Sequence, residues 1–316
     1  MNTSRPVQLS IISPVYGCAG CLESLCLRIS KAVERLGLTY EILLVDDRGP
    51  DHSWAVLERL SELYPDTLKV IRFSRNFGQH VAIIAGLAEC RGQAAIILDC
   101  DLQDPPEEIE NLYRKYQEGF RIVTARRKLK EHSQFKKMTS RFYSKLLKSV
   151  FGVNMDSETG AFSLIDRSVV NEVLRFKDNN IHYLAILDWL GFDKSHIDYK
   201  HQPREWGRSG YTLKKLLAFA LQGIFFQSTR FLLFIIISGL MISTLALAAA
   251  VWAFFVGLTG EPISGWASQM ILTSLLGGFI IVIQGVVGLY VGQIFEQVKD
   301  RPRYIVSDRL NFDKPT

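Results

Sequence analysis

Residues 94–106 read A-A-I-I-L-D-C-D-L-Q-D-P-P, so that an apolar run leads directly into a group of aspartates. A short apolar run of this kind, bounded by turn residues, is typical of a buried strand in a parallel sheet. Asp99 ends the predicted strand, and Asp101 lies two residues further on. Parallel sheets bind ligands beyond the carboxyl ends of their strands, so both aspartates lie where a ligand is expected.

The two aspartates suit a hard divalent cation. Mg²⁺ prefers oxygen ligands and typically takes one or two carboxylates together with phosphate oxygens. Asp99 and Asp101 are therefore predicted to hold Mg²⁺ or Mn²⁺ against a nucleotide diphosphate, whose developing charge the metal would neutralise. The alternative is an acidic turn that caps the next helix, with Asp104 as N-cap and Pro105 at the first helical position. For Asp104 this alternative is left open.

The first 210 or so residues alternate short β-rich runs with helical stretches, which predicts an α/β domain. The predicted strands cover residues 9–13, 41–45, 69–73, 94–98 and 122–125. The predicted helices cover residues 22–36, 53–63, 81–90 and 107–119.

Other polar residues follow the predicted strands. Asp46 and Asp47 lie after residues 41–45, where carboxylates can accept from a base N–H or a ribose hydroxyl. Asp51 is either part of that group or a turn residue that caps a helix. Residues 74–80, S-R-N-F-G-Q-H, open a helix with an arginine and a glycine, which suits phosphate, although a structural role is an equal alternative. His80 as a catalytic base is the less favoured interpretation.

Two basic segments are candidates for anion binding. Residues 126–148 contain nine Lys and Arg side chains, which form either a solvated face or a site for lipid phosphate and anionic headgroups. Residues 204–211, R-E-W-G-R-S-G-Y, carry two arginines on a glycine-containing loop. Such a loop can close over a pyrophosphate once the donor is bound, or it can be a basic linker beside the membrane.

The C-terminal third predicts membrane spans. Residues 231–259 and 262–295 contain no charged side chain, and at about 1.5 Å per residue each run can cross a hydrocarbon core of about 30 Å. Lys and Arg flank the pair of runs, while the turn between them has none, so the positive-inside rule places both termini in the cytoplasm. Residues 213–227 predict an amphipathic helix on the membrane, or a helix packed on the globular domain.

Composition adds weak constraints. The formal net charge is +5, from 37 basic and 32 acidic residues, which fits an anionic partner or membrane surface without identifying one. No signal peptide is recognised. The five cysteines lie in the first third, where a reducing cytosol is expected, so no disulfide is predicted. Cys18 and Cys21 form a C-x-x-C that is interpreted as two small loop residues rather than a redox motif.

Taken in order, these motifs resemble the inverting glycosyltransferases of family 2. The similar subgroup is the polyprenyl-phosphate glycosyltransferases, which include dolichyl-phosphate mannose synthase and bactoprenol glucosyltransferases. The resemblance covers nearly the whole chain and rests on residues 13–16 (S-P-V-Y), 45–47 (V-D-D), 74–78 (S-R-N-F-G), 99–106, the R-x-x-G-x-S-x-Y pattern of 204–211, and 299–305 (K-D-R-P-R-Y-I).

The resemblance implies a GT-A fold, an α/β (Rossmann-like) nucleotide-sugar domain followed by two transmembrane helices. The expected domains are a cytoplasmic catalytic domain (1–212), a juxtamembrane amphipathic helix (213–229), a transmembrane hairpin (230–295) and a cytoplasmic tail (296–316). The expected activity is that of a metal-dependent glycosyltransferase of the hexosyltransferase class, using Mg²⁺ or Mn²⁺. It would move a sugar from a UDP- or GDP-linked donor to a polyprenyl (undecaprenyl) phosphate, with inversion, at the bacterial inner membrane for cell-envelope glycans. Membrane lipids are expected partners, nucleic acid is not, and a homo-oligomer is left open.

The resemblance also implies roles for single residues. The expected catalytic residues are Asp101, Glu158 and Arg204, and the expected metal ligands are Asp99 and Asp101. The lipid phosphate would be bound by Arg126, Lys137 and Arg141. The expected donor-binding residues are Pro14, Tyr16, Asp46, Asp47, Arg75, Asp99, Gln103 and Arg208.

The chain departs from the family pattern at three places. Gly17-Cys18 replaces Asn-Glu after the first strand, Arg48-Gly49-Pro50 replaces Gly-Ser after the second aspartate pair, and Ala161 and Ser163 replace an acid and an arginine. Because of these changes, a non-catalytic nucleotide-sugar-binding membrane module is kept as an alternative. A processive polysaccharide synthase is a second alternative, although its Q-x-x-R-W motif is absent.

Overall fold

A computed structural model of the chain describes residues 6–127, 159–178, 182–202 and 265–312, together with positions 237–242, 244–245, 248, 251–252 and 255. The chain divides into two compact units. The first comprises Met1–Ser133, Asp156–Gly210 and Pro302–Thr316, and the second comprises Gln134–Met155 and Tyr211–Arg301.

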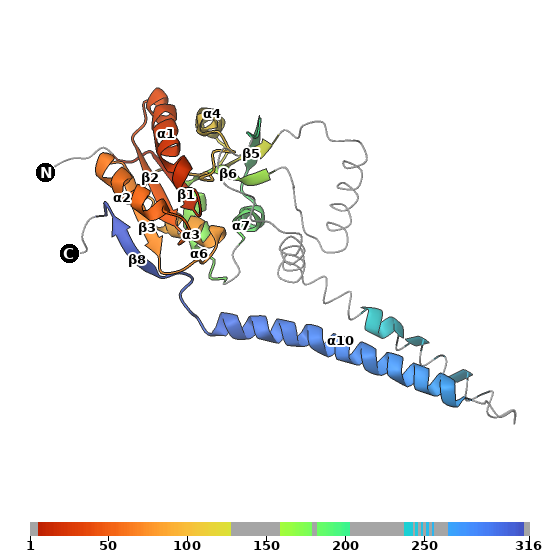
Figure 1. The fold of residues 1–316 in the computed structure, drawn as a ribbon. Helices are drawn as coiled ribbons and strands as arrows, with labels where there is room; N and C mark the ends of the chain where they lie inside the picture. The colour runs from red at the N-terminus through yellow and green to blue at the C-terminus, as the bar shows by residue number, and fades with distance from the viewer. Residues whose placement is uncertain are drawn as a thin grey trace. The chain divides into compact units, whose positions relative to one another are not determined.

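The first unit is built on one eight-stranded sheet (Figure 1). Its strand order is β7-β5-β6-β4-β1-β2-β3-β8. Strands β1 to β4 are parallel to one another, while β6 is antiparallel to β4 and β5, and β8 is antiparallel to β3. The strands are β1 (Leu9–Val15), β2 (Tyr40–Asp46), β3 (Leu68–Phe73), β4 (Ala94–Ile97), β5 (Ile122–Arg127), β6 (Thr159–Asp166), β7 (Lys194–Tyr199) and β8 (Val306–Leu310).

Helices cover both faces of this sheet (Figure 1). Alternate residues of a strand point to opposite faces, so Ile11 joins one core and Ile12 the other. The first core packs α1 (Leu22–Leu36), α2 (Ser53–Leu63) and α4 (Ile109–Gln117) against the sheet. The second core packs α3 (Gln79–Glu89), α6 (Arg167–Arg175) and α7 (Tyr183–Leu190) on the other face.

These elements confirm the predicted α/β alternation. Helix α1 has the predicted bounds because its buried Leu22, Leu25, Cys26 and Ile29 follow the helical period, and Gly37 ends it in the left-handed conformation at φ 66°. Helix α2 also has the predicted bounds. The five predicted strands correspond to β1 to β5 with shifts of one or two residues at their ends.

The strand order places a topological switch point between β1 and β4. The chain moves from β1 outward to β2 and β3 on one side, and then crosses to β4 on the other side. Ligands of open α/β sheets bind in the crevice that such a reversal creates beyond the carboxyl ends of the strands. The fold therefore predicts a site between the loops that follow β1 and β4.

The C-terminal tail is part of the sheet. Strand β8 pairs with β3, with Val70 opposite Leu310, and the ring of Tyr304 stacks on Phe73 at 5.1 Å between centroids. Sequence patterning did not indicate β8, because this edge strand is short and three of its five residues are exposed. The tail thus forms one edge of the eight-stranded sheet.

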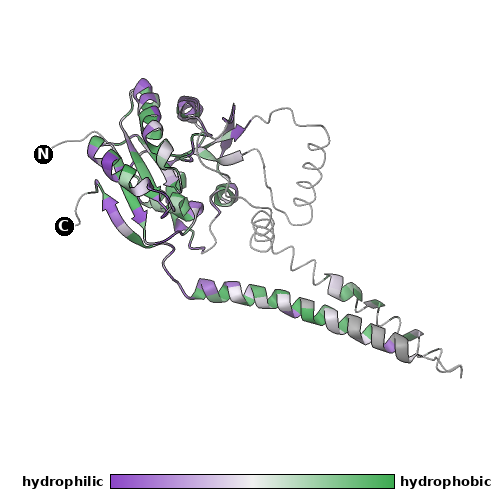
Figure 2. Cartoon of the chain, in the orientation of Figure 1, coloured by the Kyte–Doolittle hydropathy of each residue, from purple (hydrophilic) through white to green (hydrophobic). Residues whose placement is uncertain are grey.

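The second unit contains a long apolar helix, α10 (Trp266–Val298), of 33 residues. Within it, Leu276–Val298 has a mean hydropathy of 1.9, and Figure 2 shows how apolar residues extend along the helix. Among the residues described, this is the one helix long and apolar enough to cross a membrane. The predicted first span, 231–259, is described only at scattered helical positions, and the predicted amphipathic helix, 213–229, lies outside the described residues.

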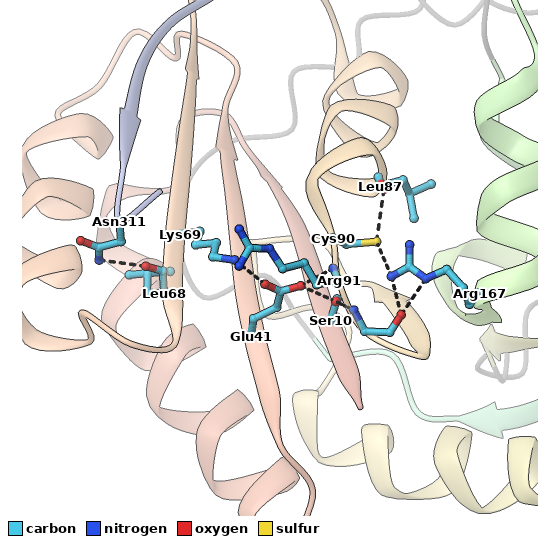
Figure 3. A network of polar contacts seen from close by, with 10 residues as sticks. Ser10, Glu41, Leu68, Lys69, Leu87, Cys90, Arg91, Arg167 and Asn311 are labelled. Carbon is cyan, nitrogen blue, oxygen red and sulfur yellow. Dashed lines mark hydrogen bonds and ion pairs between the residues drawn. The ribbon is translucent and has the colours of Figure 1, made fainter. Parts of the chain in front are cut away.

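A polar network joins the starts of the central strands at the edge opposite the predicted site (Figure 3). The Glu41 side chain is 3% exposed and pairs with Lys69 Nζ at 2.8 Å. Its other oxygen accepts hydrogen bonds from Ser10 Oγ at 2.7 Å and from the Arg91 amide at 2.6 Å. Ser10 Oγ in turn accepts from the Gly92 amide at 2.8 Å. One buried carboxylate therefore fixes β1, β2 and β3 to the turn before β4.

Replacing Glu41 with glutamine should leave Lys69 buried without its counter-charge. Because breaking a buried ion pair from one side is costly, Glu41→Gln should lower the free energy of unfolding by about 3–5 kcal/mol, measured by thermal unfolding of the purified protein. The control is Glu118→Gln, which breaks the pair of Lys115 with a 52% exposed glutamate and should change stability by less than about 1 kcal/mol. Equal changes in the free energy of unfolding for the two substitutions would contradict the stabilising role of the Glu41–Lys69 pair.

Candidate active site

The carboxyl ends of β1 to β5 and β7 lie along one edge of the sheet, as the strand directions require. The loops at this edge carry most of the predicted site residues within the described parts of the chain. Two of these loops contain a non-glycine residue in the left-handed conformation, Arg48 at φ 55° and Leu102 at φ 59°. Such backbone strain is concentrated at functional sites, where surrounding contacts maintain it.

Asp47 holds the loop that follows β3. Its two oxygens accept hydrogen bonds from the amides of Phe77 at 2.6 Å and Gly78 at 2.9 Å. Burial raises the pKa of Asp47, while these two amides act in the opposite direction. The Arg75 guanidinium lies 4.5 Å from the centre of the Phe77 ring. The structure therefore places Asp47 as the anchor of the predicted phosphate loop and Arg75 on the exposed part of that loop.

Asp46 is the other carboxylate of this pair, and only 2% of it is exposed. Burial raises the pKa of Asp46, and Arg72, whose Nε lies 3.2 Å from Asp46 Oδ2, acts in the opposite direction. The Arg72 guanidinium also lies 4.5 Å from the centre of the Trp54 ring. Tyr16, 53% exposed, follows β1, whose last residue, Val15, is in register with Asp46. An aromatic ring and a carboxylate thus stand at neighbouring strand ends.

Asp51 has a structural role. Its carboxylate accepts hydrogen bonds from the amide of Ala19 at 2.8 Å and from Ser53 Oγ at 2.6 Å. Burial acts to raise the pKa of Asp51, but these bonds outweigh it and the pKa is lowered. Gly49 packs against the preceding loop, because a Cβ there would lie 2.7 Å from the Gly17 nitrogen. Together these contacts fix the turn after β2 against the turn after β1.

Asp99 and Asp101 follow β4 as predicted. Asp99 Oδ1 accepts a hydrogen bond from Gln79 Nε2 at 2.6 Å, and Asp101 Oδ1 accepts one from the Gln103 amide at 3.2 Å. The pKa of Asp99 is raised to about 7 by burial and by the negative charges of Asp104 and Asp101, with Arg127 acting in the opposite direction. In the described parts of the chain no three His, Cys, Asp or Glu side chains form a metal site alone. Two carboxylates, completed by phosphate oxygens of a ligand, are a donor set that fits Mg²⁺ or Mn²⁺.

Asp104 is not the helix cap that the alternative interpretation gave it. The following helical turn begins at Pro106, with Pro105 at the cap position and no side-chain cap. Asp104 is fully buried, and its Oδ1 accepts hydrogen bonds from the Tyr199 hydroxyl and, at 3.5 Å, from Arg127 Nη2. The cap prediction was wrong because it considered only neighbours in sequence, whereas these partners come from β5 and β7.

The basic stretch is described only at its start. Arg126 Nε donates to Asp198 Oδ1 at 2.8 Å in an exposed pair, and Arg127 interacts with the buried Asp104, so both arginines are paired with acids. Pro14 lies in β1, buried opposite Val45. The predicted residues Lys137, Arg141, Glu158, Arg204 and Arg208 lie outside the described residues.

The altered segment after residue 158 forms part of the sheet. Ala161 and Ser163 belong to β6, and the buried Ser163 hydroxyl shares a hydrogen bond with the Tyr183 hydroxyl at 2.9 Å. A separate pair of rings lies on this face of the sheet: His80 lies against His182, with ring centroids 4.5 Å apart. Burial and His182 lower the pKa of His80 to about 4. These side chains pack α3, α6 and α7 rather than carrying charge to the crevice.

Cys18 and Cys100 form a disulfide bond, with their Cα atoms 6.4 Å apart. The prediction of no disulfide was therefore wrong in the structure, and the partner of Cys18 is not Cys21. Sequence spacing drew attention to Cys21, whereas the fold brings together two cysteines separated by 82 positions. The bond spans the switch point, because Cys18 follows β1 and Cys100 lies between Asp99 and Asp101 after β4.

Comparisons with known proteins agree with this geometry. Residues 10–174 match the family described as Glycosyl transferase family 2. The glycosyltransferase YkcC of Bacillus subtilis is 35% identical over 96% of this chain and 94% of its own length. The undecaprenyl-phosphate 4-deoxy-4-formamido-L-arabinose transferase of Edwardsiella ictaluri is 30% identical over 100% of this chain and 98% of its own.

Two further similarities concern the acceptor lipid of a relative and the fold. The SfII prophage-derived bactoprenol glucosyl transferase of Shigella flexneri is 29% identical over 95% of this chain and 97% of its own. The solved structure of glucosyl-3-phosphoglycerate synthase from Mycobacterium tuberculosis superposes with a TM-score of 0.50 at 17% identity, covering 71% of this chain and 79% of that one. At that identity the similarity concerns the fold, which is of the GT-A type.

Loss of the disulfide should loosen the aspartate loop, because Cys100 lies within it. Reduction by dithiothreitol, or Cys18→Ser, should speed amide hydrogen exchange of residues 98–104 by on the order of tenfold, with no change in β8. Dithiothreitol should have no further effect on the Cys18→Ser protein, which serves as the matched control. Identical exchange in the oxidised and reduced wild-type protein would show that the bond does not restrain this loop.

Proposed function

The chain belongs to glycosyl transferase family 2, and from this we propose that it transfers a sugar from a nucleotide to a polyprenyl phosphate at a membrane surface. The observation that carries the proposal is the placement of Asp99 and Asp101 at the switch point of a GT-A sheet, in a chain that also contains an apolar 33-residue helix. Relatives named for undecaprenyl phosphate and bactoprenol align over nearly the whole chain, the apolar helix included, which supports the same acceptor class.

The donor is a UDP- or GDP-linked sugar bound across the ends of β1, β2 and β4. Asp46 is the acceptor for base or ribose donors, and Tyr16 presents an exposed ring beside it. Arg75 lies on a loop whose backbone is fixed by Asp47, so its guanidinium can reach a phosphate without reorganising the chain. Pro14, Gln103 and Arg208 complete the proposed donor contacts.

Asp99 and Asp101 would hold Mg²⁺ or Mn²⁺. When bound, the cation neutralises charge on the leaving diphosphate. Asp99 suits this task, because burial and the negative charges of Asp104 and Asp101 raise its pKa, and a divalent cation would stabilise its ionised form. The Gln79 and Gln103 hydrogen bonds orient the two carboxylates before the ligand arrives.

In the proposed reaction an oxygen of the lipid phosphate attacks the anomeric carbon from the face opposite the nucleotide. A new carbon–oxygen bond forms as the bond to the diphosphate breaks, so the configuration is inverted. A phosphate monoester has a second pKa of about 6 and is largely ionised at neutral pH, so positioning and charge stabilisation suffice without a strong base. Arg126, Lys137 and Arg141 are proposed to bind the lipid phosphate, Arg204 to support catalysis, and Glu158 to orient acceptor or sugar.

The proposed organisation keeps the catalytic domain (1–212) and both termini on the cytoplasmic side of a bacterial inner membrane. Residues 213–229 would lie on the membrane, 230–295 would form two spans, and 296–316 would return to the cytoplasm. The apolar segment Leu276–Val298 supports one span, and the pairing of β8 with β3 supports the return of the tail to the catalytic domain.

The activity can be tested with purified protein, Mn²⁺, undecaprenyl phosphate and a panel of radiolabelled nucleotide sugars. One donor should yield a labelled lipid product that is lost with EDTA. Asp101→Ala should reduce transfer by at least about 100-fold, because a ligand of the charge-stabilising cation is removed. Asp66→Ala, an exposed aspartate in the turn before β3, should be as active as the wild type.

Other outcomes would favour other functions. Retained turnover in Asp101→Ala would contradict the metal assignment. Nucleotide binding by wild-type protein without any lipid product would favour a non-catalytic membrane module, and a long polymer would favour a processive synthase.

The raised pKa of Asp99 predicts a pH dependence of metal binding. Metal binding needs the ionised carboxylate, so protons compete with the cation below a pH of about 7 and not above it. The apparent Kd for Mn²⁺ should rise by up to about tenfold for each pH unit below that value and level off above it. Titration calorimetry over this range would check the dependence, and a flat profile would contradict it.

A further inference from the structure

The inference concerns the role of Asp104 in the proposed metal site, and it rests on the proposed function. It is one of the few charged residues that are fully buried, and it lies three positions after Asp101. A buried carboxylate lowers the stability of the fold unless its charge is compensated and its lone pairs accept hydrogen bonds. The partners of Asp104 therefore indicate what it does.

One oxygen of the Asp104 carboxylate, Oδ1, has several hydrogen-bond partners. Oδ1 accepts from the Tyr199 hydroxyl and from Arg127 Nη2, and His201 Nδ1 lies 3.2 Å away. Arg127 Nε also donates to the Tyr199 hydroxyl at 3.1 Å, so the two partners support each other. The Gln202 amide donates to the Gln103 carbonyl at 2.9 Å, which fixes the adjoining backbone. The aspartate loop after β4 is thereby attached to the ends of β5 and β7.

The other oxygen of the Asp104 carboxylate lacks a hydrogen-bond partner in the described parts of the chain. Oδ2 of Asp104 is buried and has no hydrogen-bond partner among the described groups. A buried acceptor without a partner is unfavourable, and more so when it is charged, so the negative charge of Asp104 is only partly compensated. Asp104 is close enough to Asp99 to act on it electrostatically, as Asp101 also does.

The charges of this cluster fit a divalent cation. With all three carboxylates ionised, Asp99, Asp101 and Asp104 contribute three negative charges, and Arg127 contributes one positive charge that acts on both Asp99 and Asp104. The balance is two negative charges, which a single divalent cation neutralises. Groups that surround the ligands of a metal orient those ligands and adjust its affinity through charge and hydrogen bonds to its hydration shell.

We propose that Asp104 is a positioning residue of the metal site. Tyr199 and Arg127 hold its carboxylate in place, so that its incompletely compensated negative charge acts, together with Asp99 and Asp101, on the bound Mg²⁺ or Mn²⁺. The competing role is that of a structural clamp between the β4 loop and β7, which would leave metal affinity unchanged in a folded variant.

Metal affinity can be measured without any sugar or lipid. Free Mn²⁺ is followed by electron paramagnetic resonance during titration of the detergent-purified full chain, alone and with UDP or GDP. Asp104→Asn should raise the Kd for Mn²⁺ by about 10–100-fold, and Asp104→Glu should recover part of the loss. Tyr199→Phe keeps all charges and removes one hydrogen bond, so a smaller increase is expected. Asp66→Asn removes the same charge at the opposite edge of the sheet and should leave the Kd unchanged.

Thermal unfolding of each variant separates folding from binding. A folded Asp104→Asn protein with wild-type Mn²⁺ affinity would overturn the proposal. If that variant does not fold, Tyr199→Phe decides, and an unchanged Kd would overturn the proposal. Absence of Mn²⁺ binding by the wild-type protein in every solution would also overturn it. Normal Mn²⁺ binding without a lipid product would instead contradict the proposed function and leave the role of Asp104 in place.

Discussion

Repulsion among buried carboxylates at one edge of the sheet is the constraint on which the site depends. Parallel strands bring their carboxyl ends together, and in this chain those ends carry the buried Asp46, Asp47 and Asp104 and the half-buried Asp99. Each is compensated differently: Asp46 by Arg72, Asp47 by two loop amides, and Asp104 by Tyr199 and Arg127. Asp99 accepts a hydrogen bond from Gln79, and its pKa is raised to about 7 by burial and by the charges of Asp104 and Asp101. This concentration of acidic groups is the reason why we propose that a cation carrying phosphate binds at this edge.

At the opposite edge of the sheet, where the strands begin, the buried negative charge is fully compensated. There Glu41 is also buried, but its oxygens are satisfied by Lys69, Ser10 and the Arg91 amide. A satisfied network of this kind rigidifies the sheet and leaves no unmet acceptor for a ligand. The two ends of the strands therefore differ. Where the strands begin, the buried charges are compensated and stabilise the sheet, whereas at their carboxyl ends some negative charge remains uncompensated.

The tail connects the apolar helix back to the eight-stranded sheet. The chain leaves the catalytic unit after β7 and returns to it at Pro302, where β8 pairs with β3 and Tyr304 stacks on Phe73. Phe73 in turn packs edge-on against Phe77 at 5.5 Å between ring centroids, in the loop held by Asp47. The loop after β3 is thus supported by residues that follow the apolar helix, and the tail belongs to the same compact unit as the sheet.

Local periodicity and composition were sufficient for much of the chain. They predicted the alternation of strands and helices, the positions of Asp46, Asp47, Asp99 and Asp101 at strand ends, and an apolar helix near the C-terminus, because each depends on residues adjacent along the chain. The folded chain was needed to show that Cys18 joins Cys100, that Asp104 binds Tyr199 across 95 positions rather than capping a helix, and that the tail completes the sheet. These contacts follow from strand order and register, which bring distant segments together and leave no periodic signal in the sequence of either one.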